Sequence, residues 1–228
     1  MPLDRTRPDS TERVAEPAGA EPRWQASLAL LGVLLLQLGL PDRLTVGPRY
    51  FLPVLEAILL VPLTFVNPYR DERETRLART ASVGLLGLLN VANVYSLVLL
   101  VRLLVDGGSK ADGHRLILSA VVIWLTLVVN FGLAFWEFDC GGPASRAVAG
   151  RRAPDLMFPQ DDNPDVASAG WAPGFVDYLY TSFTNASAFS PTDTLPLSRW
   201  TKLLFLAESL TSLVTIALVA ARAVNILN

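Results

Sequence analysis

The sequence predicts an all-α integral membrane protein with five transmembrane helices and a re-entrant helix and loop between the last two. Hydrophobic residues make up 51% of the 228 residues, and they gather in runs close to the ~20 residues that a helix needs to cross a bilayer. These runs lack the alternation of barrel strands, and lipid admits only helices and closed barrels. A short segment rich in aromatic residues, followed by an irregular loop, separates the last two runs.

Residues 1–23 mix charges of both signs with proline and are poor in aliphatic side chains. Such a composition cannot bury a core, so we expect a disordered tail. The tail is not expected to be a signal peptide, because an acidic segment precedes the first apolar run and that run begins late.

Residues 24–105 are predicted to form a peripheral bundle of three transmembrane helices. The three apolar runs are Trp24–Leu40, Tyr50–Val66 and Thr80–Val105. The first ends at a Pro-Asp turn, and the second carries one acidic residue, Glu56. The third has Arg102 as a nearly isolated basic residue, so the bundle lacks the regularly spaced arginines of a voltage sensor.

Polar side chains recur at helical spacing inside the third and fourth runs. Those of the third run are Asn90, Asn93 and Ser96, and those of the fourth are Thr126, Asn130 and Glu137. Residues at such spacings lie on one face of a helix. Because polar side chains in lipid require partners, we expect the face in the third run to pack against other helices.

Residues 106–228 are predicted to form a second unit. Its parts are a helix over 115–138, a polar excursion over 139–172, a re-entrant helix and loop over 173–197, and a last helix over 198–227. Proline and glycine are frequent in the excursion, which predicts a hydrated segment with little regular structure and an exposed Cys140.

The residues around the loop form a recognisable order. Tyr178, Tyr180 and Phe183 lie in the aromatic helix, Ser187 in its last turn, and Asp193, Pro196 and Ser198 after the loop. This order resembles the pore module of the tetrameric potassium-channel superfamily, where an aromatic pore helix runs into T-x-x-T-V-G-Y-G-D and then a proline and a hydroxyl residue. The resemblance covers residues 115–227 and implies a homotetramer around a four-fold axis.

The loop departs from the family pattern at the selectivity filter. The five residues in place of T-V-G-Y-G are Ala188, Phe189, Ser190, Pro191 and Thr192. A potassium filter aims successive carbonyls at the ion, and its glycines permit the backbone angles required. Ser190 and Thr192 replace both glycines, and a proline biases Ser190 toward extended angles. We therefore expect no potassium-selective filter.

Two functional interpretations follow from the resemblance. In the first, a hydrated pore selects monovalent cations weakly, with Ser187, Ser190 and Thr192 offering hydroxyls and Asp193 a carboxylate ring. In the second, Phe189 and Pro191 of four chains seal the axis, and the protein is a non-conducting scaffold or an accessory subunit. The candidate pore-loop residues are Ser187, Ala188, Phe189, Ser190, Pro191, Thr192 and Asp193.

The last helix carries a polar stripe on an otherwise apolar surface. Its members are Glu208, Ser212, Thr215, Arg222 and Asn225, which share one helical face. Charges inside a membrane usually face a bundle interior or a water-filled cavity. We expect the stripe to face the pore. The alternative is that Glu208 and Arg222 pair with neighbouring helices, for example Glu208 near Trp200 and the pore helix.

The basic residues give an orientation that conflicts with the resemblance. The short loop over 67–80 carries Arg70, Arg73, Arg76 and Arg79, and it shares a side of the membrane with the tail and the pore loop. The positive-inside rule places that side in the cytoplasm, whereas potassium channels have the pore loop outside. Either the module is inverted, as in the ionotropic glutamate receptors, or the charge rule misleads here.

Other function classes lack support in the sequence. The chain has no catalytic or phosphate-binding motif, so we expect neither an enzyme nor a cofactor. One cysteine, Cys140, and one histidine, His114, exclude a disulfide within the chain and predict no metal site. A net charge of −2 gives no reason to expect nucleic acid. The expected partners are the lipid bilayer, further copies of the chain and monovalent cations, and the expected location is the bacterial inner membrane.

Overall fold

The computed structural model describes residues 24–39, 53–58, 76–105, 113–146, 153–163, 165, 167–168, 171–187 and 193–227. The tail over 1–23, the filter positions 188–192 and most of the second apolar run lie outside the described residues.

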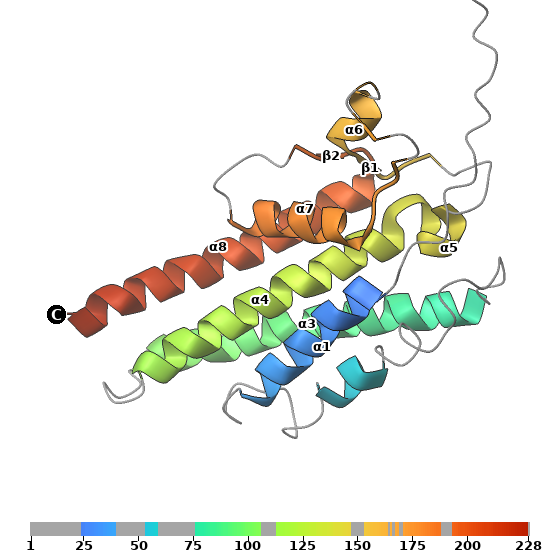
Figure 1. Ribbon diagram of the computed structural model, residues 1–228. Coiled ribbons are helices and arrows are strands. Elements are labelled where there is room, and N and C mark those ends of the chain that lie inside the picture. Colours follow the sequence, from blue (N-terminus) through green and yellow to red (C-terminus); the bar gives the residue numbers. More distant parts are fainter. Residues whose placement is uncertain are drawn as a thin grey trace, which may run out of the picture.

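The protein is mostly helical (Figure 1). The longer helices are α1 (Trp24–Leu38), α3 (Arg76–Val105), α4 (Gly113–Phe138), α7 (Phe175–Ser187) and α8 (Arg199–Leu227). The short elements are a 3-10 turn, η3 (Asp139–Gly141), two single-turn helices, α5 (Pro143–Arg146) and α6 (Pro159–Asp162), and two strands, β1 (Leu156–Met157) and β2 (Leu195–Pro196).

Three of the described helices are long and apolar enough to cross a membrane. These spans are Ser82–Leu103, Arg115–Gly141 and Arg199–Ala221. Helix α1 is apolar but has only 15 residues, and the second apolar run is described only over 53–58, where it is helical. The predicted class of helical membrane protein is confirmed to this extent, and the count of five spans stays a prediction.

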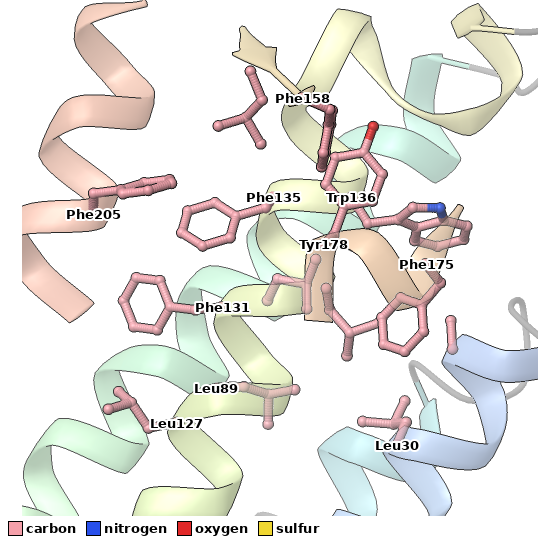
Figure 2. Close-up of a cluster of buried hydrophobic side chains, with 14 of the residues drawn as sticks. Leu30, Leu89, Leu127, Phe131, Phe135, Trp136, Phe158, Phe175, Tyr178 and Phe205 are labelled. Carbon is pink, nitrogen blue, oxygen red and sulfur yellow. The ribbon is translucent and has the colours of Figure 1, made fainter. Parts of the chain in front are cut away.

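Helix α4 is the centre of the molecule and packs against all four other long helices. In Figure 1 it runs between α7 and α8 on one side and α1 and α3 on the other. Its last two turns are buried without interruption from Phe131 to Glu137. Figure 2 shows its aromatic side chains meeting Phe175 and Tyr178 of α7 and Phe205 of α8. The strongly apolar fourth run thus becomes the core helix.

The polar stripe of α3 is turned toward α4, as predicted. Asn93 and Ser96 are buried, and the amide nitrogen of Asn93 donates to the backbone oxygen of Ile123 at 3.2 Å. Asn90 instead donates to the oxygen of Leu86 in its own helix, at 2.9 Å.

The excursion after α4 is more ordered than predicted. Cys140, expected at the surface, is buried, and the backbone there turns through three residues with positive φ: Cys140 (52°), Gly141 (86°) and Gly142 (96°). Farther along, β1 pairs antiparallel with β2, which follows the segment predicted to be a pore loop. The prediction of a hydrated segment is wrong for these parts, because the buried carboxylate of Asp139 accepts hydrogen bonds from the backbone amides of Asp155 and Leu156.

Candidate functional site around helix α7

Helix α7 lies along the second half of α4, antiparallel to it. The ring of Phe175 meets that of Trp136 edge to face, with centroids 6.0 Å apart. One turn later Leu179 passes so close to Gly132 that a Cβ there would lie 3.1 Å from the Cα of Leu179. Glycine at this position therefore permits the close approach of the two helices.

The C-terminal end of α7 contacts the middle of α4. Phe183 packs edge to face on Trp124, with ring centroids 5.7 Å apart. The hydroxyl of Ser182 donates to the backbone oxygen of Val128 at 2.7 Å. The helix thus extends along α4 from Trp136 to Trp124, over about three turns.

The same end of α7 is bonded to the middle of α8. The amide of Asn185 donates to the backbone oxygen of Phe205 at 3.1 Å, and its oxygen accepts from the hydroxyl of Ser209 at 3.0 Å. The hydroxyl of Ser212 donates to the oxygen of Ala186, one of the last carbonyls of α7. Such carbonyls have no partner within the helix, so α8 caps α7 at a point near the centre of the span Arg199–Ala221.

From Asp193 onward the chain is described again, and Thr194 lies beside the middle of α7. The hydroxyl of Thr194 lies 3.1 Å from that of Thr181. Leu195 then pairs with Met157, and the amide of Leu197 donates to the oxygen of Asp155 at 2.9 Å. The described chain thus stops at Ser187, beside the middle of α8, and is described again from Asp193, near the residues where α8 begins.

A buried polar cluster holds the inner end of α7, which we call the inner cluster (Ser182, Asn185, Glu208, Ser209 and Ser212). Glu208 is fully buried. One carboxyl oxygen is bonded to the hydroxyl of Ser182, and the other accepts from the amide of Asn185 at 2.6 Å. Ser212 accepts from the indole nitrogen of Trp124 at 2.7 Å. Three helices thus share one network, and hydrogen-bonded polar groups inside a bundle fix how the helices pack.

The polar stripe of α8 therefore points into the protein. Glu208, Ser212 and Thr215 are all buried within the single chain, so the expectation that they face a pore does not fit this packing. Glu208 instead has two hydrogen bonds to α7, which fits the alternative in which it pairs with a neighbouring helix. A carboxyl group removed from water requires hydrogen-bond partners, and α7 supplies them through Ser182 and Asn185. The side chain of Arg222 lies outside the described residues.

A second cluster fixes the outer end of α7, which we call the outer cluster (Asp139, Arg146, Asp155, Leu156 and Tyr178). The carboxylate of Asp139 accepts from the amides of Asp155 and Leu156, at 2.9 and 3.2 Å, and from the hydroxyl of Tyr178 at 2.6 Å. Arg146 donates to the backbone oxygens of Trp136 and Asp139, both at 2.8 Å, and its guanidinium lies 5.0 Å from the centroid of the Tyr178 ring.

Sequence reasoning missed the outer cluster. Its signal was an aspartate directly after an apolar helix, followed by two glycines, with an arginine shortly after. We interpreted these residues as part of a solvated excursion, because no local pattern shows that a tyrosine almost 40 residues later meets the aspartate.

The pore-loop residues are only partly described. Ser187 donates to the oxygen of Thr184 in its own helix at 3.2 Å, and Asp193 is exposed. Ala188, Phe189, Ser190, Pro191 and Thr192 lie outside the described residues. Among the residues that the structure does describe, no three His, Cys, Asp or Glu side chains gather in a way that could hold a metal ion.

Comparison of the chain with protein-family models, curated proteins and solved structures finds no match.

Proposed function

We propose that the chain is an ion-channel-like membrane protein that forms a homotetrameric pore of weak cation selectivity. The observation that carries the proposal is the course of the chain around α7. The 13 residues of this helix extend for roughly 20 Å, from the outer cluster to the centre of α8, and Thr194 then lies beside Thr181. In a membrane, a helix and loop of this course enter and leave on one side.

Asp193 is the residue through which the loop acts on ions in this proposal. Its side chain is exposed, and it lies next to Thr194, which is bonded to α7. Four copies around an axis would form a ring of carboxylates, and acidic rings favour cations. The replaced filter glycines favour a hydrated path of weak selectivity over a potassium filter. The proposed setting is the inner membrane of a bacterium.

Single-channel recording tests this proposal. The purified chain is reconstituted in planar bilayers with asymmetric KCl, beside Asp193→Asn and a matched control, Asp165→Asn, at an exposed position of the excursion. We expect current whose reversal potential moves toward zero in Asp193→Asn and is unchanged in Asp165→Asn. An equal shift in both variants would remove Asp193 from the ion path.

A second candidate function, a non-conducting scaffold or accessory subunit, is favoured by the outward surface of α8. With the polar stripe turned inward, the exposed side chains of this helix are largely apolar, among them Leu203, Leu206, Leu210 and Leu213. An axis lined by these residues would exclude water, and hydrophobic constrictions close pores by dewetting. Silent bilayers from chains whose tetrameric mass has been confirmed would favour this candidate.

A further inference from the structure

A second buried carboxyl group lies far along the chain from α7. Glu56 belongs to the helical segment over 53–58 and has 0% of its surface exposed. Its neighbour Leu55 packs against the main hydrophobic core. One carboxyl oxygen of Glu56 accepts from the side-chain amide of Gln37, on α1, at 2.6 Å. The other oxygen, Oε2, is buried and has no hydrogen-bond partner.

The surroundings of Glu56 that the structure describes offer no compensating charge. Helix α1 contains no Asp, Glu, Lys or Arg, and the bonded partner, Gln37, is a neutral amide. An ionised carboxylate buried without a counter-charge costs several kcal/mol or more. The negative charge must therefore be neutralised, either by a proton on the carboxyl group or by a cation bound beside it.

Further buried polar atoms without a partner lie on α3 and α4, which share the main hydrophobic core with Leu55. They are Oδ1 of Asn90 on α3, and Oγ1 of Thr126 and both amide atoms of Asn130 on α4. Buried polar groups are nearly always bonded to protein or to ordered water. The part of the bundle that the structure describes therefore has spare oxygen ligands but no bonded positive group at Glu56.

We propose that Glu56, held by Gln37, forms a site for a single positive charge inside the peripheral bundle. The charge is a proton or a monovalent metal cation such as Na⁺ or K⁺, and both use the free oxygen of the same carboxyl group. This site is separate from the loop after α7, and it does not require that the loop conducts.

Glu208 is a control inside the same chain. It too is fully buried, but its two carboxyl oxygens are bonded to Ser182 and Asn185. Glu208 therefore has no free carboxyl oxygen for a bound ion. A reagent that detects an available carboxylic acid in an apolar environment should distinguish the two residues.

Dicyclohexylcarbodiimide, which partitions into apolar environments, is such a reagent. The carboxyl proton moves to one carbodiimide nitrogen, the carboxyl oxygen bonds to the central carbon, and the adduct rearranges to an acylurea that keeps all atoms of the reagent. The full-length chain in detergent micelles is treated in acidic and alkaline buffers, with choline, Na⁺ or K⁺ chloride. Mass spectrometry of the peptides then gives the labelled fraction at Glu56 and Glu208.

We expect labelling at Glu56 to exceed labelling at Glu208 several-fold in acidic choline buffer. If labelling at Glu56 falls in alkaline buffer and does not change with Na⁺ or K⁺, the bound charge is a proton. Labelling that falls when Na⁺ or K⁺ replaces choline at constant pH identifies it as a metal cation. Equal labelling of the two residues in all buffers would contradict the proposal.

A thermal measurement covers the case in which the reagent does not reach Glu56. A cation that binds only the folded chain raises the midpoint of thermal unfolding as its concentration rises. The variant Glu56→Gln keeps an oxygen for Gln37 to donate to, and should lose this response. If labelling is absent, and if the unfolding midpoints of wild type and Glu56→Gln respond alike to Na⁺, to K⁺ and to pH, the proposal is overturned.

Discussion

The two sides of α4 use buried polar groups in opposite ways. On the side of α7 and α8, the carboxyl oxygens of Glu208, the amide of Asn185 and the hydroxyl of Ser212 all have partners. None of the buried, unpaired side-chain atoms among the described residues belongs to α7 or α8. On the side of α1 and α3, Glu56 and Asn90 retain unpaired atoms.

The difference indicates what each side is built to do. A fully bonded network holds its helices in one arrangement, because each displacement leaves a buried donor or acceptor without a partner. Groups left unpaired give no such rigidity, and their desolvation cost is recovered only if an ion, a proton or water occupies the site. The bonded network fixes the position of the α7 side, and the unpaired atoms of the α1 side agree with the proposed site at Glu56.

The largest expected effect on the free energy of unfolding comes from removing the carboxylate of Asp139, in the outer cluster. The variant Asp139→Ala leaves the amides of Asp155 and Leu156 and the hydroxyl of Tyr178 without their acceptor. We expect the free energy of unfolding to fall by about 3–5 kcal/mol, measured by denaturant titration in detergent micelles.

The control for this variant is Asp162→Ala, at an exposed position of α6, which should change the free energy of unfolding by less than about 0.5 kcal/mol. Similar losses in the two variants would show that the outer cluster does not hold α7.

A smaller effect is expected where α4 and α7 approach each other. In Gly132→Ala, the new methyl group would meet the backbone of Leu179 at 3.1 Å. Because backbone moves less readily than a flexible side chain, we expect α7 to shift and the free energy of unfolding to fall by about 1–3 kcal/mol.

Helix α3 supplies the matched control, because a Cβ at Gly84 would meet nothing within 4 Å. Gly84→Ala should stabilise the protein by about 0.5–1 kcal/mol, through the higher helix propensity of alanine. A stabilising Gly132→Ala would contradict the tight contact between α4 and α7. Both variants can be compared by their midpoints of thermal unfolding.

Sequence patterns predicted the parts of this fold that depend on composition. Long apolar runs predicted the helices that became α3, α4 and α8, and the spacing of Asn93 and Ser96 predicted the face that packs on α4. The aromatic amphipathic segment predicted a short helix, which is α7. Period and hydrophobicity are local properties, and these predictions needed nothing else.

What could not be predicted depends on contacts between distant residues. The stripe of Glu208 was found from its spacing, but spacing does not show which neighbour a helical face meets. The burial of Asp139 and Cys140 follows from Tyr178 and from the backbone of the excursion. Likewise, no pattern around Glu56 shows that one of its oxygens lacks a partner.

The smallest effect is expected at Asn130 of α4, and the same substitution at Asn185 of α7 is its comparison. In Asn130→Leu, an apolar side chain of similar volume replaces a buried amide that has no hydrogen bond. We therefore expect the free energy of unfolding to rise by about 1 kcal/mol. In Asn185→Leu the same change removes hydrogen bonds to Phe205, Glu208 and Ser209. We expect the free energy of unfolding to fall by about 1–3 kcal/mol. Denaturant titration of both variants shows whether the free energy of unfolding rises or falls in each. A loss in Asn130→Leu as large as in Asn185→Leu would mean that the amide of Asn130 is also hydrogen-bonded, and the contrast between the two residues would not hold.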